Sequence, residues 1–206
     1  MTPKILLKIT ERYSEPHRCY HNIMHPSSMF EQSRLWDIDL SPEQIMAIWF
    51  HDIIYDVPQL EKGMNEKKSA EFAGEILSED FDKTFVDIVK TIILDSITAI
   101  ATIKPSQIVQ DLDLCVLGEL GYFDSYVPMI EHEFKMLSPF DFLHGRIQFL
   151  EEFLGREFIY HTEQFQNKYE EVARINMKQE LEVRHHQLVT LKPLATGVPH
   201  PDSDNK

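Results

Sequence analysis

The placement of prolines and the scarcity of glycines constrain the fold of this chain more than any other sequence feature. Seven glycines occur in 206 residues, and most of the prolines fall at the boundaries of segments with helical apolar periodicity. Folds built from many short strands need more turn residues than this. No long alternating apolar and polar pattern competes with the helical one, and no internal repeat is evident. The sequence therefore predicts an all-α fold, a single-domain bundle of seven to nine helices.

Several of the expected helices carry recognisable start signals. Ser41 can cap a helix, with Pro42 at its first position and Gln44 three residues after the cap. Asn65 and Asp80 are expected to cap two further helices, and prolines at 26 and 105 suit first turns. The expected helices span about residues 25–35, 42–50, 66–77, 81–94, 106–117, 123–137, 140–154 and 162–187.

Length and composition bound the domain organisation. A chain of 206 residues suits one domain that can bury a substantial core. From Lys192 onward, Pro, Gly, Ser, Asp and Asn replace apolar residues. We therefore expect one domain over residues 1–190 and a flexible C-terminal tail over residues 191–206.

The net charge and the absence of long apolar runs exclude some classes of protein. A formal charge of −14 argues against general nucleic-acid binding, which needs a basic surface. There is no run of about 18 apolar residues and no signal segment, so we expect a cytoplasmic protein without a membrane partner. The two cysteines are too few for a disulfide framework.

The pair His51-Asp52 ends the apolar run that starts at Ile45. Imidazole and carboxylate both bind divalent metals, and two adjacent residues at a helix end can reach one ion. An ionised pair in apolar surroundings is costly to bury without a partner, and a bound cation is one such partner. The alternative is a hydrogen-bonded His-Asp pair that stabilises a helix end and does no chemistry.

Two other segments supply further ligand types. His21 and His25 stand four residues apart upstream of the pair, and Asp111-Leu112-Asp113 lies downstream in an apolar segment. On a helical wheel, Asp111 and Asp113 fall on opposite margins of the apolar stripe, so periodicity does not choose between them. The chain thus offers His, His-Asp and Asp in this order.

These segments together resemble the HD superfamily of metal-dependent phosphohydrolases, and most closely a bacterial group of predicted HD-type phosphohydrolases with few assigned substrates. The resemblance covers about residues 5 to 183. Its further motifs are Gly145-Arg146, Ile159 to Thr162 and Ala173 to Asn176. Its main motifs are Tyr20-His21-Asn22-Ile23-Met24-His25, Trp49 through Asp56, Asn65-Glu66-Lys67-Lys68-Ser69-Ala70 and Asp111 through Gly118.

The resemblance implies roles for individual residues. By likeness to HD alarmone hydrolases and cyclic-nucleotide phosphodiesterases, His25 is the metal ligand and His21 the general acid. The closing ligand is expected at Asp113, because the family's last Asp precedes a Leu-type residue. The resulting metal ligands are His25, His51, Asp52 and Asp113.

Asp56 and Glu66 occupy positions where the family carries acidic residues. Either could orient the attacking water, and each could equally form a salt bridge at a helix end. Because the chain is acidic, a phosphate substrate must rely on the metal and on a few local cations. The candidates for substrate contacts are Arg18, Lys67 and Arg146.

The chain also departs from the family. No histidine occurs between His51 and His132, so the additional histidines of dinuclear HD enzymes are missing. Asp95-Ser96-Ile97-Thr98 stands where close relatives often end a helix with Thr and His. The missing histidines favour a single metal ion and disfavour a two-metal phosphodiesterase, whereas the altered Asp95 to Thr98 segment indicates weaker catalysis or a different substrate.

The expected function is hydrolysis of the phosphate ester of a small phosphorylated metabolite, with a nucleotide as the leading class. The expected cofactor is one divalent transition metal (Mn, Fe, Co, Ni or Zn), since these ions suit mixed nitrogen and oxygen ligands. The alternative is a catalytically weak HD protein that binds a nucleotide or partner and uses its metal for structure.

Overall fold

All regular secondary structure in the described part of the chain is helical. The computed structural model describes residues 2–58 and 61–191, and no strand occurs in these ranges. This confirms the predicted all-α bundle of seven to nine helices. The helices are α1 (Pro3–Tyr13), α2 (Met24–Leu35), α3 (Pro42–Phe50), α4 (Met64–Leu77), α5 (Lys83–Asp95), α6 (Lys104–Leu114), the short 3-10 helix η1 (Cys115–Gly118), α7 (Tyr122–Glu133), α8 (Pro139–Leu154) and α9 (Glu163–Leu191).

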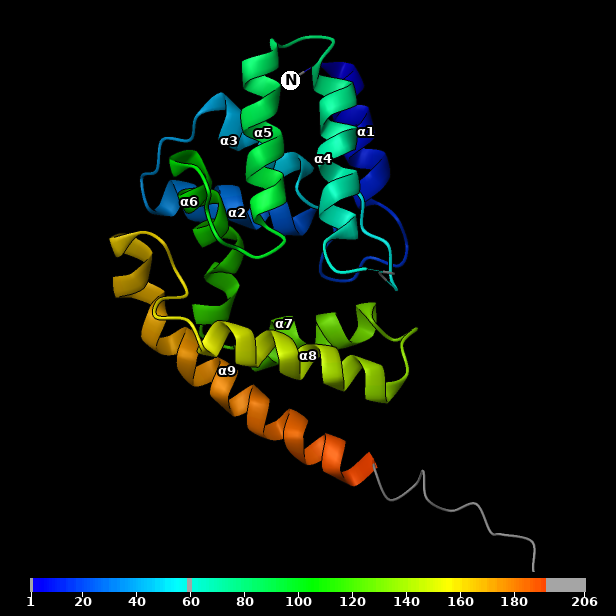
Figure 1. Ribbon diagram of the computed structural model, residues 1–206, viewed down its shortest axis with the longest axis vertical. Helices are drawn as coiled ribbons and strands as arrows, with labels where there is room; N and C mark the ends of the chain where they lie inside the picture. The colour runs from blue at the N-terminus through cyan, green and yellow to red at the C-terminus, as the bar shows by residue number, and fades with distance from the viewer. Residues whose placement is uncertain (1, 59–60, 192–206) are drawn as a thin grey trace, which may run out of the picture.

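The helices form two groups that α6 and η1 connect. In Figure 1, α1, α3, α4 and α5 lie together in the upper part of the view, and α7, α8 and α9 lie in the lower part. Within the groups, α4 and α3 pack against α5, and α8 packs against α9. Helix α6 contacts α2, α3 and α5, while η1 contacts α7 and α9. The connection therefore brings the end of α6 to the junction of both groups.

Helix α3 begins as predicted. The Ser41 hydroxyl accepts a hydrogen bond from the Gln44 backbone N–H at 3.3 Å, and the Gln44 side chain accepts one from the Ser41 N–H at 2.8 Å. This reciprocal capping box satisfies two donors at the helix start. It confirms the predicted start of α3.

Two of the predicted helix caps were wrong. Helix α4 starts after Gly63, whose φ of 80° suits a residue without a Cβ, and Asn65 lies inside the helix. The Asn65 side chain instead accepts from the Asp56 N–H at 3.0 Å and donates to the Asp56 carbonyl at 3.1 Å. Helix α5 is capped by Asp82, which accepts from a backbone N–H in the first turn, and not by Asp80.

Tertiary contact decides how α6 ends. The sequence predicts one helix over 106–117, but α6 stops at Leu114 and the chain tightens into η1. A Cβ at Gly118 would lie 2.6 Å from the Tyr169 Cβ, so only glycine allows this approach of η1 to α9.

The two ends of the chain differ from the sequence prediction in different ways. Helix α1 was not predicted, although Thr2 caps it and Pro3 opens it. Helix α9 continues beyond the predicted end to Leu191. The predicted tail lies, apart from Leu191, outside the described residues. Among the described helices, none is long and apolar enough to cross a membrane.

Candidate metal centre

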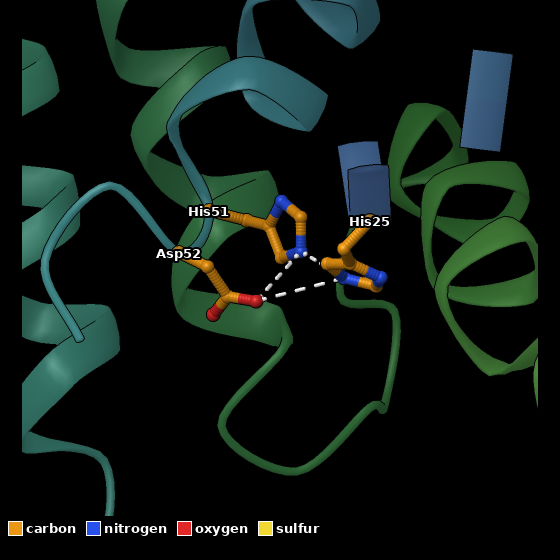
Figure 2. A group of neighbouring side chains, drawn as sticks. All are labelled: His25, His51 and Asp52. Carbon is orange, nitrogen blue, oxygen red and sulfur yellow. Dashed lines mark hydrogen bonds and ion pairs between the residues drawn. The ribbon is translucent and has the colours of Figure 1, made fainter. Parts of the chain in front are cut away.

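Three buried side chains converge where α2 meets the end of α3. His25 lies in the first turn of α2, His51 follows the last residue of α3, and Asp52 comes next along the chain. Figure 2 shows the imidazoles and the carboxylate pointing toward one another. Their ligand atoms all lie within 4.8 Å of one another. This group could hold a metal ion.

The separations between these ligand atoms fit a single ion. The two Nε2 atoms of His25 and His51 are 3.0 Å apart. Asp52 Oδ2 lies 3.1 Å from His51 Nε2 and 3.6 Å from His25 Nε2. Ligands bound to one transition metal at about 2.1 Å are roughly 3 to 3.5 Å from one another. The geometry of the three side chains therefore matches a shared ion.

Asp113 closes the group from α6. Its Oδ1 lies 3.0 Å from His25 Nε2 and 3.7 Å from His51 Nε2. The side chain is partly exposed, unlike the buried imidazoles. We refer to His25, His51, Asp52 and Asp113 as the His-Asp cluster.

Asp111, the alternative candidate for the closing ligand, binds backbone groups outside the His-Asp cluster. Its side chain is fully buried and accepts hydrogen bonds from the His161 N–H at 2.6 Å and the Thr162 N–H at 2.8 Å. The Thr162 hydroxyl donates a third hydrogen bond to the same carboxylate at 2.6 Å. Asp111 therefore holds the segment that leads into α9, and only Asp113 faces the histidines.

A backbone hydrogen bond orients the His51 ring. The Nδ1–H of His51 donates to the Ile48 carbonyl at 2.8 Å, which leaves the Nε2 lone pair for the centre. His25 is held by packing, because its ring lies 5.0 Å from the Tyr20 ring and its Nδ1 has no hydrogen-bond partner among the described residues. Both imidazoles present the same type of atom to the centre.

The cluster concentrates negative charge in a buried place. Burial lowers the pKa of His25. Burial also opposes protonation of His51, but the charge of Asp52 outweighs burial and raises the His51 pKa to about 9. Burial would raise the pKa of both carboxyls, but the imidazoles beside them hold the pKa values of Asp52 and Asp113 below the ordinary value. A divalent cation would supply the positive charge that a proton on His51 otherwise supplies.

His21 lies beside the cluster and is held by Glu133. The Nδ1 of His21 is 2.6 Å from Glu133 Oε2, and the other carboxylate oxygen accepts from the His21 and Cys19 N–H groups at 3.1 and 3.0 Å. The opposite ring atom, Nε2, faces Asp52 Oδ2 at 4.0 Å. The ring also stacks on Tyr55 with centroids 4.0 Å apart. Glu133 thus turns the free nitrogen of His21 toward the His-Asp cluster.

Arg18 is buried beside the site and is not part of the cavity lining. Its side chain is 0% exposed. The guanidinium donates to the His21 carbonyl at 3.0 Å, to the Asp52 carbonyl at 2.6 Å and to the Ile53 carbonyl at 3.0 Å. Its donors are therefore used to fasten the His21 segment to the end of α3, which differs from the substrate contact expected from the sequence.

A cavity of about 790 Å³ opens from the cluster toward α7 and α8. Its lining includes His21, His51, Asp52 and Asp113 at the polar end. Glu66 also lines it, and Glu66 Oε2 is buried with no hydrogen-bond partner among the described residues. Burial raises the pKa of the Glu66 carboxyl. A partly desolvated carboxyl beside a candidate metal site is suited to accept a proton.

The remaining candidate residues lie elsewhere. The exposed Asp56 carboxylate pairs with Lys68 at 2.7 Å, away from the cavity lining. Lys67 is exposed and is also not part of the lining. Arg146 does line the cavity, but its guanidinium forms two 2.9 Å hydrogen bonds with Glu180. The structure therefore brings Glu66 and Arg146 to the cavity, and Asp56 and Lys67 lie outside it.

Sequence reasoning missed Glu133, Tyr55 and Lys62, which hold His21 or line the cavity. Glu133 is 112 residues from His21, so no local spacing could connect them. Tyr55 belongs to the Trp49 through Asp56 motif, which was a usable signal. Lys62 offered none.

Comparison with known proteins identifies no relative. No family model, no curated protein and no solved structure matches this chain. The functional inference therefore depends on the residues of the site.

Proposed function

We propose that this chain is a mononuclear, metal-dependent phosphohydrolase of the HD type, acting on the phosphate ester of a small metabolite. The convergence of His25, His51, Asp52 and Asp113 from three separate helix ends carries the proposal. The motif resemblance supports it, since these positions are the ones it assigns to the metal. A nucleotide is the first substrate class to test, and a cytoplasmic location remains part of the proposal.

The cluster would hold one divalent ion with mixed nitrogen and oxygen ligands, which suits Mn, Fe, Co, Ni or Zn. When bound, such an ion lowers the pKa of a coordinated water and offsets charge on the phosphoryl group. The protein contributes the orientation of the ligands through the Ile48 carbonyl and the Arg18 contacts.

In this proposal, His21 donates a proton to the leaving oxygen. In its protonated form, the imidazolium keeps one N–H on Glu133 and directs the other toward the cluster. The buried carboxylate stabilises that positive charge and fixes the ring orientation. Water attack at phosphorus would break the ester P–O bond, and the His21 proton would neutralise the released alkoxide.

Glu66 is the candidate residue to orient the attacking water and to accept its proton. It lines the same cavity as His21 and carries an unpartnered oxygen. Its raised pKa suits a group that accepts a proton during the reaction.

The direct test combines metal analysis with a phosphate-release screen. Protein purified without chelator is assayed for bound metal and then for phosphate release from a panel of esters with several divalent ions. We expect metal in the wild type, loss of metal in His51→Ala and loss of metal-dependent turnover in Asp52→Ala. Equal metal content in wild type and His51→Ala would refute the site.

A second function has its own support. The two cations of the described cavity lining are already paired, Arg146 with Glu180 and Lys62 with Glu152. A weakly active protein that binds a nucleotide or partner, with a structural metal, would need no free phosphate-binding cation. Ligand-induced thermal stabilisation without turnover would favour this alternative.

A further inference from the structure

The wall of the cavity opposite the His-Asp cluster is apolar. Helix α8 and the turn before it provide phenylalanine rings that are partly buried or, at Phe153, buried, and α7 provides the buried Ile130. Two ring pairs occur there, Phe134 with Phe142 and Phe149 with Phe153, with centroids 6.3 and 4.6 Å apart. The apolar lining residues on this wall are Ile130, Phe134, Leu137, Phe142, Phe149 and Phe153.

Arg146 is the one charged residue of this wall that is buried, and its guanidinium is bonded to Glu180, whereas the other charged and amide residues among the described lining are exposed. Asp141, Gln148, Glu151 and Glu152 are all exposed members of the lining. Three of the four are acidic. A substrate group that carries further phosphates would meet these carboxylates, of which only Glu152 is paired with a cation of the described lining, Lys62, so the lining favours a single phosphoryl group at the cluster.

Gly145 leaves space in this wall. It lies in the interior of α8, where glycine costs about 1 kcal/mol relative to alanine. No heavy atom lies within 4 Å of the position that its Cβ would take. No neighbouring protein atom would clash with a side chain at this position, so packing does not explain the glycine. The absence of a side chain does widen the cavity.

We propose that the substrate is a monophosphate ester whose organic part is an apolar aryl or alkyl group, which lies along α8 over Gly145 and the phenylalanines. This rests on the proposed phosphohydrolase function and puts an apolar ester in place of the nucleotide as the leading substrate class. Sugar hydroxyls and base edges need hydrogen-bond partners, and the polar groups in the inner part of this wall, Tyr126 and Arg146, are bonded to each other and, through Arg146, to Glu180. An apolar group instead gains from removal of apolar surface from water.

The test compares four substrates in the metal-loaded protein: 1-naphthyl phosphate, AMP, ATP and glycerol phosphate. We expect kcat/KM for 1-naphthyl phosphate to be at least about tenfold higher than for AMP, and kcat/KM for ATP to be the lowest. Apolar contacts in a pocket typically discriminate between substrates by about 10- to 200-fold. If AMP or ATP is hydrolysed as well as 1-naphthyl phosphate, the apolar class is wrong while the phosphohydrolase function stands.

Gly145→Leu tests the location without touching the His-Asp cluster. The added side chain should lower kcat/KM for 1-naphthyl phosphate by about tenfold and leave that for glycerol phosphate within about twofold. The control is His144→Leu, which adds the same side chain at a neighbouring exposed position outside the lining. Equal effects of Gly145→Leu on both substrates would overturn the proposed location.

Calorimetry separates the two proposals if no ester is hydrolysed. The phosphohydrolase function would then fail. Tighter binding of 1-naphthyl phosphate than of AMP, weakened by Gly145→Leu, would still support an apolar ligand class in this cavity. Equal binding, or binding that Gly145→Leu does not change, would overturn it.

Discussion

Glu133 Oε2 lies 2.6 Å from His21 Nδ1, although the two residues are 112 positions apart in the chain. The carboxylate is 2% exposed, and burial would raise its pKa, but hydrogen bonds from His21 and from backbone N–H groups hold the Glu133 pKa below the ordinary value. Glu133 therefore stays ionised and orients the imidazole next to the His-Asp cluster.

Glu133→Gln should reduce turnover by about 10²-fold and leave the metal content unchanged, because general acid catalysis contributes about 10²- to 10⁴-fold. The amide cannot stabilise an imidazolium as a carboxylate does. Steady-state kinetics with metal analysis would measure both effects. The double variant His21→Ala with Glu133→Gln should be no slower than His21→Ala alone. Additive losses would show that Glu133 acts independently of His21.

Asp113 and Asp111 form a matched pair for the closing ligand. Asp113→Ala should weaken metal binding at least about 100-fold, since removal of even supporting groups costs 10- to 100-fold. Asp111→Ala should retain the metal and lose roughly 2 to 4 kcal/mol of unfolding free energy, because three hydrogen bonds to a buried carboxylate disappear. Metal titration and urea unfolding distinguish these outcomes. The assignment fails if Asp111→Ala is the variant that loses the ion.

Arg18→Lys should destabilise the protein by about 2 kcal/mol and weaken metal binding as well. A single ammonium cannot reach the three carbonyls that the guanidinium joins, so the His21 segment and the end of α3 would separate. Thermal unfolding and metal titration would be compared with Arg34→Lys, an exposed substitution on α2. If Arg18→Lys had wild-type stability and metal binding and changed only KM, the result would support the sequence prediction that Arg18 contacts the substrate.

Glu180 should make the free energy of unfolding depend on pH. Burial would raise its pKa, but the Arg146 guanidinium outweighs burial and holds the Glu180 pKa below the ordinary value. A lowered pKa in the folded state stabilises the fold above the unfolded value of about 4.3, and this contribution disappears as the pH falls through the folded pKa.

Glu180→Gln should therefore cost roughly 3 to 5 kcal/mol at pH 7, the range for breaking a buried ion pair. The difference from wild type should shrink as the pH falls below about 4. Urea unfolding at several pH values measures it. A difference that stays constant with pH would show that the Glu180 charge does not contribute.

Local sequence alone determined the helical class and several helix boundaries. The capping box of Ser41 and Gln44 acts within four residues, so its signal is complete in the sequence. The same holds for the placement of His51 and Asp52 directly after α3, because the length of one amphipathic helix sets it. The ligand types of the candidate metal site could therefore be predicted without the fold.

Only the tertiary structure decided which of these side chains meet. Asp111 and Asp113 both lie on the margins of the α6 stripe, but the segment before α9 binds Asp111, and Asp113 lies beside His25. The roles of Arg18 and Glu133 likewise depend on contacts 34 and 112 residues away. Sequence periodicity specifies the face of a helix, whereas partners across the bundle depend on how separate helices pack, and that information is not local.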